Sequence, residues 1–103
     1  MAVEPLSQKD VEDRLQELPG WTTDGDRISR TYSFEGHFQA AAMVIHIAQI
    51  QEELGHHSDL TLGYQTIRLS VNTHSVGGKV TGLDVELARR VEAIASGHGA
   101  RRP

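Results

Sequence analysis

The 103-residue sequence contains no cysteine, so neither a disulfide framework nor a thiolate metal site is possible. No apolar run approaches the ~20 residues that a membrane-spanning helix needs. Basic residues are outnumbered, with 10 lysines and arginines against 14 acidic residues, which argues against a general nucleic-acid-binding protein. The N-terminal residues lack the basic start and apolar stretch of a secretory signal. These absences predict a soluble, cytoplasmic protein with no membrane partner and no direct nucleic-acid partner.

The length and the hydrophobic periodicity predict a single α+β domain spanning residues 1–103. The expected elements are a helix over 8–18, a hairpin over 21–34, a helix over 36–54, strands at 59–62 and 64–74, and a helix after Thr81. This α-β-β-α-β-β-α order favours an antiparallel four-stranded sheet with helices packed on one face, because strand 64–74 alternates between an apolar and a polar face. The end segments 1–6 and 97–103 are expected to be flexible.

The helix expected over 36–54 carries two apolar stripes. One is formed by Met43, Ile47, Ile50 and Leu54, and the other, roughly opposite, by Phe38, Ala41, Ile45 and Ala48. A helix that contacts only its own core needs a single stripe. The second stripe indicates an interface, most simply with another copy of the chain. The alternative is that a short domain wraps the helix on both sides.

The stretch EELGHHSDL, residues 52–60, places two adjacent histidines directly after a glycine. Gly55 is suited to end the helix, and Glu52 comes four residues before His56. If helical geometry continued through Gly55, Glu52 and His56 would share a face and hydrogen-bond to each other. Such a carboxylate partner would fix the tautomer of the imidazole and stabilise its charged form.

A third histidine, His74, is expected at the end of strand 64–74, beside the Gly77-Gly78 loop. A side chain at such a position can be both held and exposed. Two histidines that face one cleft can act as acid and base in the same cycle, one donating a proton and the other accepting it. This arrangement suits the elimination of water from a neutral molecule.

Other interpretations of these residues remain open. The adjacent histidines can be polar loop residues, His74 an exposed strand end, and Glu52 a solvated helix carboxylate. A zinc site of His56, His57 and His74 is conceivable, because three histidines and a water form a known catalytic set. Neighbouring residues on an extended backbone point to opposite sides, however, which disfavours two adjacent ligands for one ion.

The spacing of these residues resembles that of the pterin-4a-carbinolamine dehydratase family. The match consists of Glu52-x-x-x-His56-His57, then Tyr64, then His74 ten residues later, with Asp84 beyond. The stretches Leu18-Pro19-Gly20-Trp21 and Thr73-His74-x-x-Gly77-Gly78 also look like the family. The resemblance covers about residues 10–95.

The resemblance implies an enzyme that removes water from a 4a-hydroxytetrahydropterin and returns a quinonoid dihydropterin. It also implies that no metal or bound cofactor is needed and that the chain forms a homodimer or a dimer of dimers. Carried over by position, His56 and His74 would be the acid–base pair and His57 would contact the pterin substrate. Glu52 and Asp84 would orient these groups or bind the substrate.

The sequence departs from the family at three positions. Ser58 follows the two histidines where the family usually has proline, which predicts a less rigid turn. Leu60 stands where some members have tryptophan, and Asp84 lies one residue further from His74 than expected. Asp84 can instead be the capping-box residue of the last helix, whose N-cap is Thr81.

A second function, from a different class, is a non-catalytic dimerisation or assembly factor on the same fold. The family includes members that stabilise a dimeric transcription factor or assist the assembly of another protein. A binding module does not need all three histidines, so their presence favours the enzyme.

Overall fold

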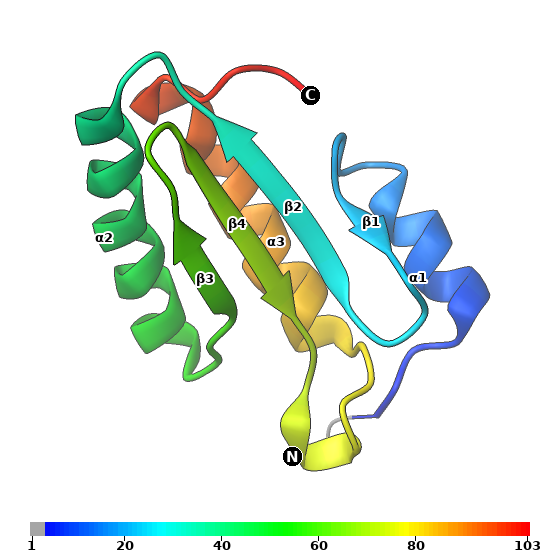
Figure 1. Ribbon diagram of the computed structural model, residues 1–103. Coiled ribbons are helices and arrows are strands. Elements are labelled where there is room, and N and C mark those ends of the chain that lie inside the picture. Colours follow the sequence, from blue (N-terminus) through cyan, green and yellow to red (C-terminus); the bar gives the residue numbers. More distant parts are fainter. Residues whose placement is uncertain (1–3) are drawn as a thin grey trace.

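The computed structural model describes residues 4–103, and Figure 1 shows the arrangement of its helices and strands. The elements in chain order are α1 (Gln8–Leu15), β1 (Thr22–Thr23), β2 (Ile28–Ser33), α2 (His37–Leu54), β3 (Asp59–Leu62), β4 (Thr66–Val71), the 3₁₀ turn η1 (His74–Val76), α3 (Gly82–Ala95) and the 3₁₀ turn η2 (Ser96–His98). The predicted α+β order is therefore confirmed. Within residues 4–103, no helix is both long and apolar enough to cross a membrane.

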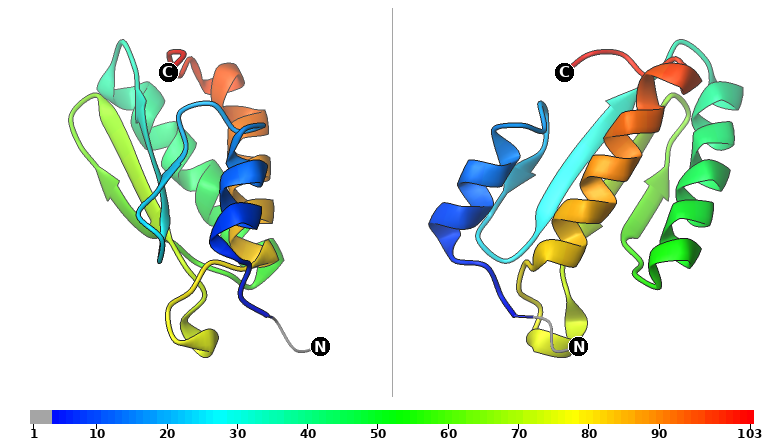
Figure 2. Two further views of the ribbon diagram at one scale, coloured as in Figure 1. Left: turned by 90° about the vertical axis from the view of Figure 1, so that its right-hand side faces the viewer. Right: turned by 180° about the vertical axis from the view of Figure 1, so that it is seen from behind.

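The four strands form one antiparallel sheet in the order β1-β2-β4-β3. The helices cover one face of this sheet, as the side view and the view from behind in Figure 2 show. The alternation predicted for strand 64–74 is present in β4, where Ile67, Leu69 and Val71 are buried against the helices. Thr66, Arg68 and Ser70 lie on the opposite face of β4 and are less buried, so the core lies between the sheet and the helix layer.

Two elements are shorter than their periodicity predicted. Helix α1 ends at Leu15, not at residue 18, because the amides of residues 16–18 each bond three residues back and tighten into turns before Pro19. Strand β4 ends at Val71. The prediction that this strand continues to residue 74 is therefore wrong. The Thr73 amide donates to the Lys79 carbonyl at 2.8 Å, which closes a loop and turns the chain into η1 at His74.

The end segments make contacts that their sequences did not indicate. In the N-terminal segment predicted to be flexible, residues 1–3 lie outside the described residues. Within the described part of that segment, the Leu6 amide donates to the Val80 carbonyl at 2.8 Å. At the other end, the Arg101 amide donates to the Ser33 carbonyl, also at 2.8 Å. The flexibility of both segments stays a prediction.

His46 of α2 and His98 of η2 are hydrogen-bonded to each other, with 2.8 Å between Nδ1 and Nε2. Burial, and then the charge of His46, lower the pKa of His98 below its ordinary value. This contact could not be predicted from local patterns, because the two histidines lie 52 positions apart in the chain. The pair joins the C-terminal turn to the middle of α2.

The two stripes of α2 have different environments. Met43, Ile47 and Ile50 are buried in the core, whereas Phe38 is 84% exposed and Ile45 is 74% exposed. The interpretation in which the domain wraps both sides of this helix is therefore wrong. An exposed pair of large apolar side chains on one helix is typical of an interaction surface.

Gly55 is the backbone position on which the end of α2 depends. Its φ of 62° places it in the left-handed region, and the amides of Gly55 and His56 bond back to the carbonyls of Glu52 and Gln51. No atom lies within 4 Å of where a Cβ would stand on Gly55. The cost of a side chain there is therefore conformational strain alone.

We predict that Gly55→Ala lowers the free energy of unfolding by about 1 kcal/mol, because alanine is strained in the left-handed region. Gly82 is the matched control: a Cβ there also meets nothing within 4 Å, but its φ lies outside the left-handed region. Gly82→Ala should be neutral or should stabilise the protein by a few tenths of a kcal/mol. Urea unfolding of the three proteins measures this difference, and equal effects of the two substitutions would contradict it.

Candidate active site

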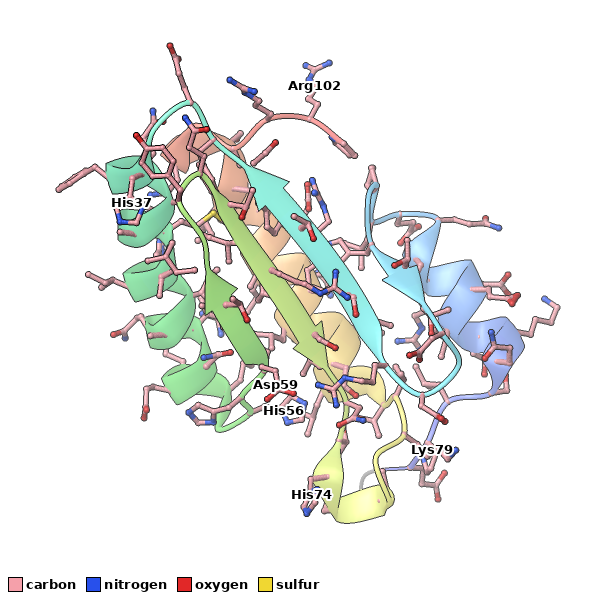
Figure 3. All side chains as sticks on the ribbon, in the orientation of Figure 1. His37, His56, Asp59, His74, Lys79 and Arg102 are labelled. Carbon is pink, nitrogen blue, oxygen red and sulfur yellow. The ribbon has the colours of Figure 1, made fainter. Side chains whose placement is uncertain are left out.

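The predicted site residues come from element ends at one pole of the molecule. Helix α2 ends there just before His56, β4 leads there into η1 at His74, and α3 begins there with Asp84 in its first turn. Figure 3 shows His56 and His74 toward this pole and His37 at the opposite end of α2. Three chain segments that are distant in sequence thus supply the histidines and their partners.

His56 is paired with Asp84 and not with Glu52. The distance from His56 Nε2 to Asp84 Oδ1 is 2.5 Å, and the side chains of these two residues are 11% and 0% exposed. The predicted Glu52–His56 hydrogen bond is wrong because the left-handed Gly55 turns the chain out of the helix. Glu52 instead lies 3.5 Å from Nε2 of His57, and both of these side chains are largely exposed.

Asp84 both caps α3 and holds His56. As the third residue of the helix it accepts the Thr81 amide at 2.8 Å on Oδ2, which completes a capping box. The same oxygen accepts the Thr73 hydroxyl at 2.8 Å. A carboxylate in the first turn is further stabilised by the helix dipole. The two interpretations of Asp84 drawn from the sequence, cap and site residue, are therefore compatible.

His74 is the first residue of η1, not the end of a strand, and its side chain is exposed. Its loop is anchored by the backbone bond from Thr73 to Lys79 and by Gly77, whose φ of 74° ends the 3₁₀ turn. Among the described residues, His74 forms no hydrogen bond or ion pair with the other four predicted site residues. The structure thus directly links two pairs, His56–Asp84 and His57–Glu52.

The zinc site considered from the sequence has no geometric counterpart in the part of the chain that the structure describes. No three histidine, aspartate or glutamate side chains in residues 4–103 come close enough to hold one metal ion. His56 is instead bonded to Asp84, which is in turn bonded to Thr73 and Thr81. This arrangement suits proton transfer by an oriented imidazole.

A sequence model of the family described as pterin 4 alpha carbinolamine dehydratase matches residues 4–94. The chain belongs to this family. A Streptomyces avermitilis protein provisionally named a pterin-4-alpha-carbinolamine dehydratase is 73% identical over 100 residues, which cover 97% of this chain and 99% of the relative. A Streptomyces coelicolor protein with the same provisional name is 64% identical over the same shares of the two chains.

Solved structures agree with this assignment. A Brucella melitensis protein described as a transcriptional coactivator/pterin dehydratase superposes with a TM-score of 0.84 at 31% identity, over 89% of this chain and 99% of that one. A pterin dehydratase-like protein described as a RuBisCO assembly factor in the alpha-carboxysome has a TM-score of 0.60 at 20% identity, covering 73% and 86%. The second likeness shows a common fold only.

Ser58, where the pterin-4a-carbinolamine dehydratase family usually has proline, fixes its turn by hydrogen bonding. Its amide and its hydroxyl both donate to Oε1 of Gln51, at 2.8 and 2.5 Å. Proline has neither donor. Gln51, itself buried, thus ties the chain after His57 back to the last turn of α2. The lower rigidity expected for this turn stays a prediction.

Sequence reasoning missed the roles of Thr73, Thr81 and Gln51. In the alternation of strand 64–74, Thr73 falls on the same face as Ile67, Leu69 and Val71. Thr81 falls at a predicted helix cap, and both threonines are buried. Their contact with Asp84 depends on the packing of the Thr73 loop against the start of α3. A threonine on a mostly apolar strand face was the available signal, because buried polar groups need partners.

We predict that Asp84→Asn lowers the free energy of unfolding by about 2 kcal/mol, because hydrogen bonds to a buried charge are worth roughly 1.5–3 kcal/mol. Glu52→Gln is the matched control, since it makes the same change in a side chain that is 78% exposed. It should change stability by less than about 0.5 kcal/mol. Urea unfolding at neutral pH measures both, and equal losses would show that Asp84 is not the structural anchor of the site.

Proposed function

We propose that this chain removes water from a 4a-hydroxytetrahydropterin and releases a quinonoid dihydropterin. Membership of the pterin-4a-carbinolamine dehydratase family and the names of its close relatives support this activity. The observation that carries it is the buried Asp84 carboxylate bound to His56 at 2.5 Å, beside an open pole where His57 and His74 are exposed. An imidazole oriented in this way is poised for proton transfer.

The reaction needs one proton donor and one proton acceptor. The C4a–O bond breaks as the leaving hydroxyl receives a proton and departs as water. A ring N–H next to the breaking bond loses its proton, and its electron pair forms the new C=N bond. The oxidation level of the molecule does not change, so two histidines, His56 and His74, can perform both transfers in our proposal.

The remaining site residues have roles that follow from their exposure. His57 and Glu52 lie at the surface beside His56, where they can contact the pterin ring. Asp84 is fully buried, so we assign it to holding His56 and not to direct contact with the substrate. Ser58 and Gln51 keep the segment that carries both adjacent histidines in place.

We predict that the wild-type protein accelerates dehydration of a synthetic 4a-hydroxytetrahydropterin, measured by stopped-flow absorbance. His56→Ala and His74→Ala should each reduce kcat/KM by about 10²–10⁴-fold, the range typical of general acid–base catalysis. His37→Ala is the matched control, because His37 lies at the far end of α2 and should leave the rate unchanged.

Circular dichroism and urea unfolding establish that each variant is folded before its rate is compared. No acceleration by the wild type over buffer would contradict the dehydratase proposal. Acceleration that survives both histidine substitutions would contradict the assignment of His56 and His74 while leaving the activity in place.

We further propose that the exposed stripe of α2 joins this chain to other copies of itself, in a homodimer or a dimer of dimers. The exposed fractions of Phe38 and Ile45, 84% and 74%, support an apolar interface there. The alternative proposal, a non-catalytic dimerisation or assembly factor, would use the same face for a different protein. The stopped-flow experiment separates the alternatives, because an assembly factor need not accelerate the reaction.

We predict that Phe38→Glu halves the mass of the oligomer in sedimentation velocity, from dimer to monomer or from dimer of dimers to dimer, because it places a charge in an apolar interface. Lys9→Glu is the control, since Lys9 is an exposed residue of α1 and should leave the mass unchanged. A wild-type protein that sediments as a monomer, or an oligomer unaffected by Phe38→Glu, would contradict this interface.

A further inference from the structure

Behind His56, the side chains of Thr73, Thr81 and Asp84 form a polar cluster that is larger than the cap of a helix requires. Thr81 and Asp84 are fully buried and Thr73 is 3% exposed. The hydroxyl oxygens of Thr73 and Thr81 are 2.7 Å apart, and the Leu83 amide donates to the Thr81 hydroxyl at 3.2 Å. Every polar atom of this cluster therefore has a partner, as burial demands.

The direction of these hydrogen bonds follows from counting protons. Asp84 Oδ2 faces two donors, the Thr81 amide and the Thr73 hydroxyl, each at 2.8 Å, which is the environment of an ionised carboxylate. Thr73 has one hydroxyl proton, and the bond to Asp84 uses it. Thr81 must then donate its own proton to Thr73, since its alternative contact with Asp84 is 3.5 Å long.

The resulting chain runs in one direction, from the Leu83 amide through the hydroxyls of Thr81 and Thr73 to the Asp84 carboxylate. Its last member, Asp84 Oδ1, lies 2.5 Å from His56 Nε2. Because an ionised carboxylate only accepts, Nε2 must carry a proton. The other ring nitrogen, Nδ1, is then the atom of His56 that is free to take up or release a proton.

We propose that Thr73 is a positioning residue that fixes His56 with its proton on Nε2, so that Nδ1 exchanges protons with the substrate. The exchange of protons between Nδ1 and the substrate rests on the proposed function above. The position of the His56 proton on Nε2 does not. Thr73 never contacts the substrate in this account, because its side chain is buried behind Asp84.

Thr73 also connects the two histidines assigned to acid–base chemistry. It is the residue before His74, its amide bonds to Lys79 at 2.8 Å, and its carbonyl accepts the Gly78 amide at 3.2 Å. Its side chain holds the partner of His56, while its backbone closes the loop that carries His74. A displacement of Thr73 therefore moves both histidines, although 18 residues separate them in the sequence.

Two substitutions separate the hydroxyl of Thr73 from its methyl group. Thr73→Val keeps the shape and removes the hydrogen bond, whereas Thr73→Ser keeps the hydrogen bond and removes the methyl group. A packing role predicts that serine is the more harmful change. The positioning role predicts that valine is.

The direct readout is the His56 ring in ¹H–¹⁵N spectra at about pH 8.5, where an ordinary histidine is neutral. His56 signals are assigned by their loss in His56→Gln. We expect the wild type to show a proton on Nε2 in slow exchange with water. Thr73→Val should speed that exchange at least about 10-fold, and Thr73→Ser should stay close to the wild type.

Asp84→Asn provides a second readout that does not depend on Thr73→Val being folded. The Thr81 amide and the Thr73 hydroxyl both donate to the position of Oδ2, so the amide oxygen of the asparagine should occupy it. The asparagine NH₂ then faces His56 Nε2 and can only donate. We expect the proton of His56 to move to Nδ1 in this variant.

Steady-state kinetics complete the test. Thr73→Val should lower kcat roughly 10-fold with little change in KM, because a residue remote from the substrate affects the chemical step and not binding. Thr73→Ser should restore kcat. If the wild type proves inactive, the proposed function fails, while the spectra still decide the role of Thr73.

Three results would overturn the positioning role. The first is a wild-type His56 that carries its neutral-state proton on Nδ1. The second is an Nε2 proton that exchanges equally fast in the wild type and Thr73→Val. The third is a loss of the Nε2 proton signal in Thr73→Ser but not in Thr73→Val, which would assign Thr73 to packing.

Discussion

A carboxylate removed entirely from water is the constraint on which this structure depends. Asp84 is 0% exposed, and a buried charge is tolerated only when hydrogen bonds replace its hydration. Its donors come from three places: the start of α3, the Thr73 loop and His56 after the end of α2. The requirement for these donors therefore sets the relative positions of three chain segments, and the same contacts orient the histidine. The Asp84 carboxylate therefore contributes both to stability and to the proposed chemistry.

The sheet and the glycines explain why those segments meet. Antiparallel pairing of β4 with β2 and β3 brings the end of β4 to the pole where β3 begins. The left-handed Gly55 ends α2 at that pole and turns His56 toward α3, and Gly77 closes the 3₁₀ turn that carries His74. The opposite stripe of α2 takes no part in this arrangement. Its exposed Phe38 is free to serve association without disturbing the site.

The periodic elements could be predicted from sequence, and the contacts between them could not. The α-β-β-α-β-β-α order, the caps at Gly55 and Thr81, and the alternation of β4 follow from local patterns that the structure confirms. The partner of His56 was predicted as Glu52 because helical spacing is local, whereas the true partner, Asp84, is 28 residues away. The left-handed geometry of Gly55 decides between them. The alternation of the predicted strand likewise places Thr73 on its buried face, but the bond from Thr73 to Asp84 depends on tertiary packing.

The most direct test of this account is a crystal structure with a stable dihydropterin bound, because it locates the ring relative to each histidine. The pterin ring should lie at the pole formed by His56, His57 and His74. The ring should also lie within hydrogen-bond distance of Nδ1 of His56, while Nε2 stays bound to Asp84. A pterin bound elsewhere on the chain, or one that contacts His56 through Nε2 with Asp84 displaced, would contradict it.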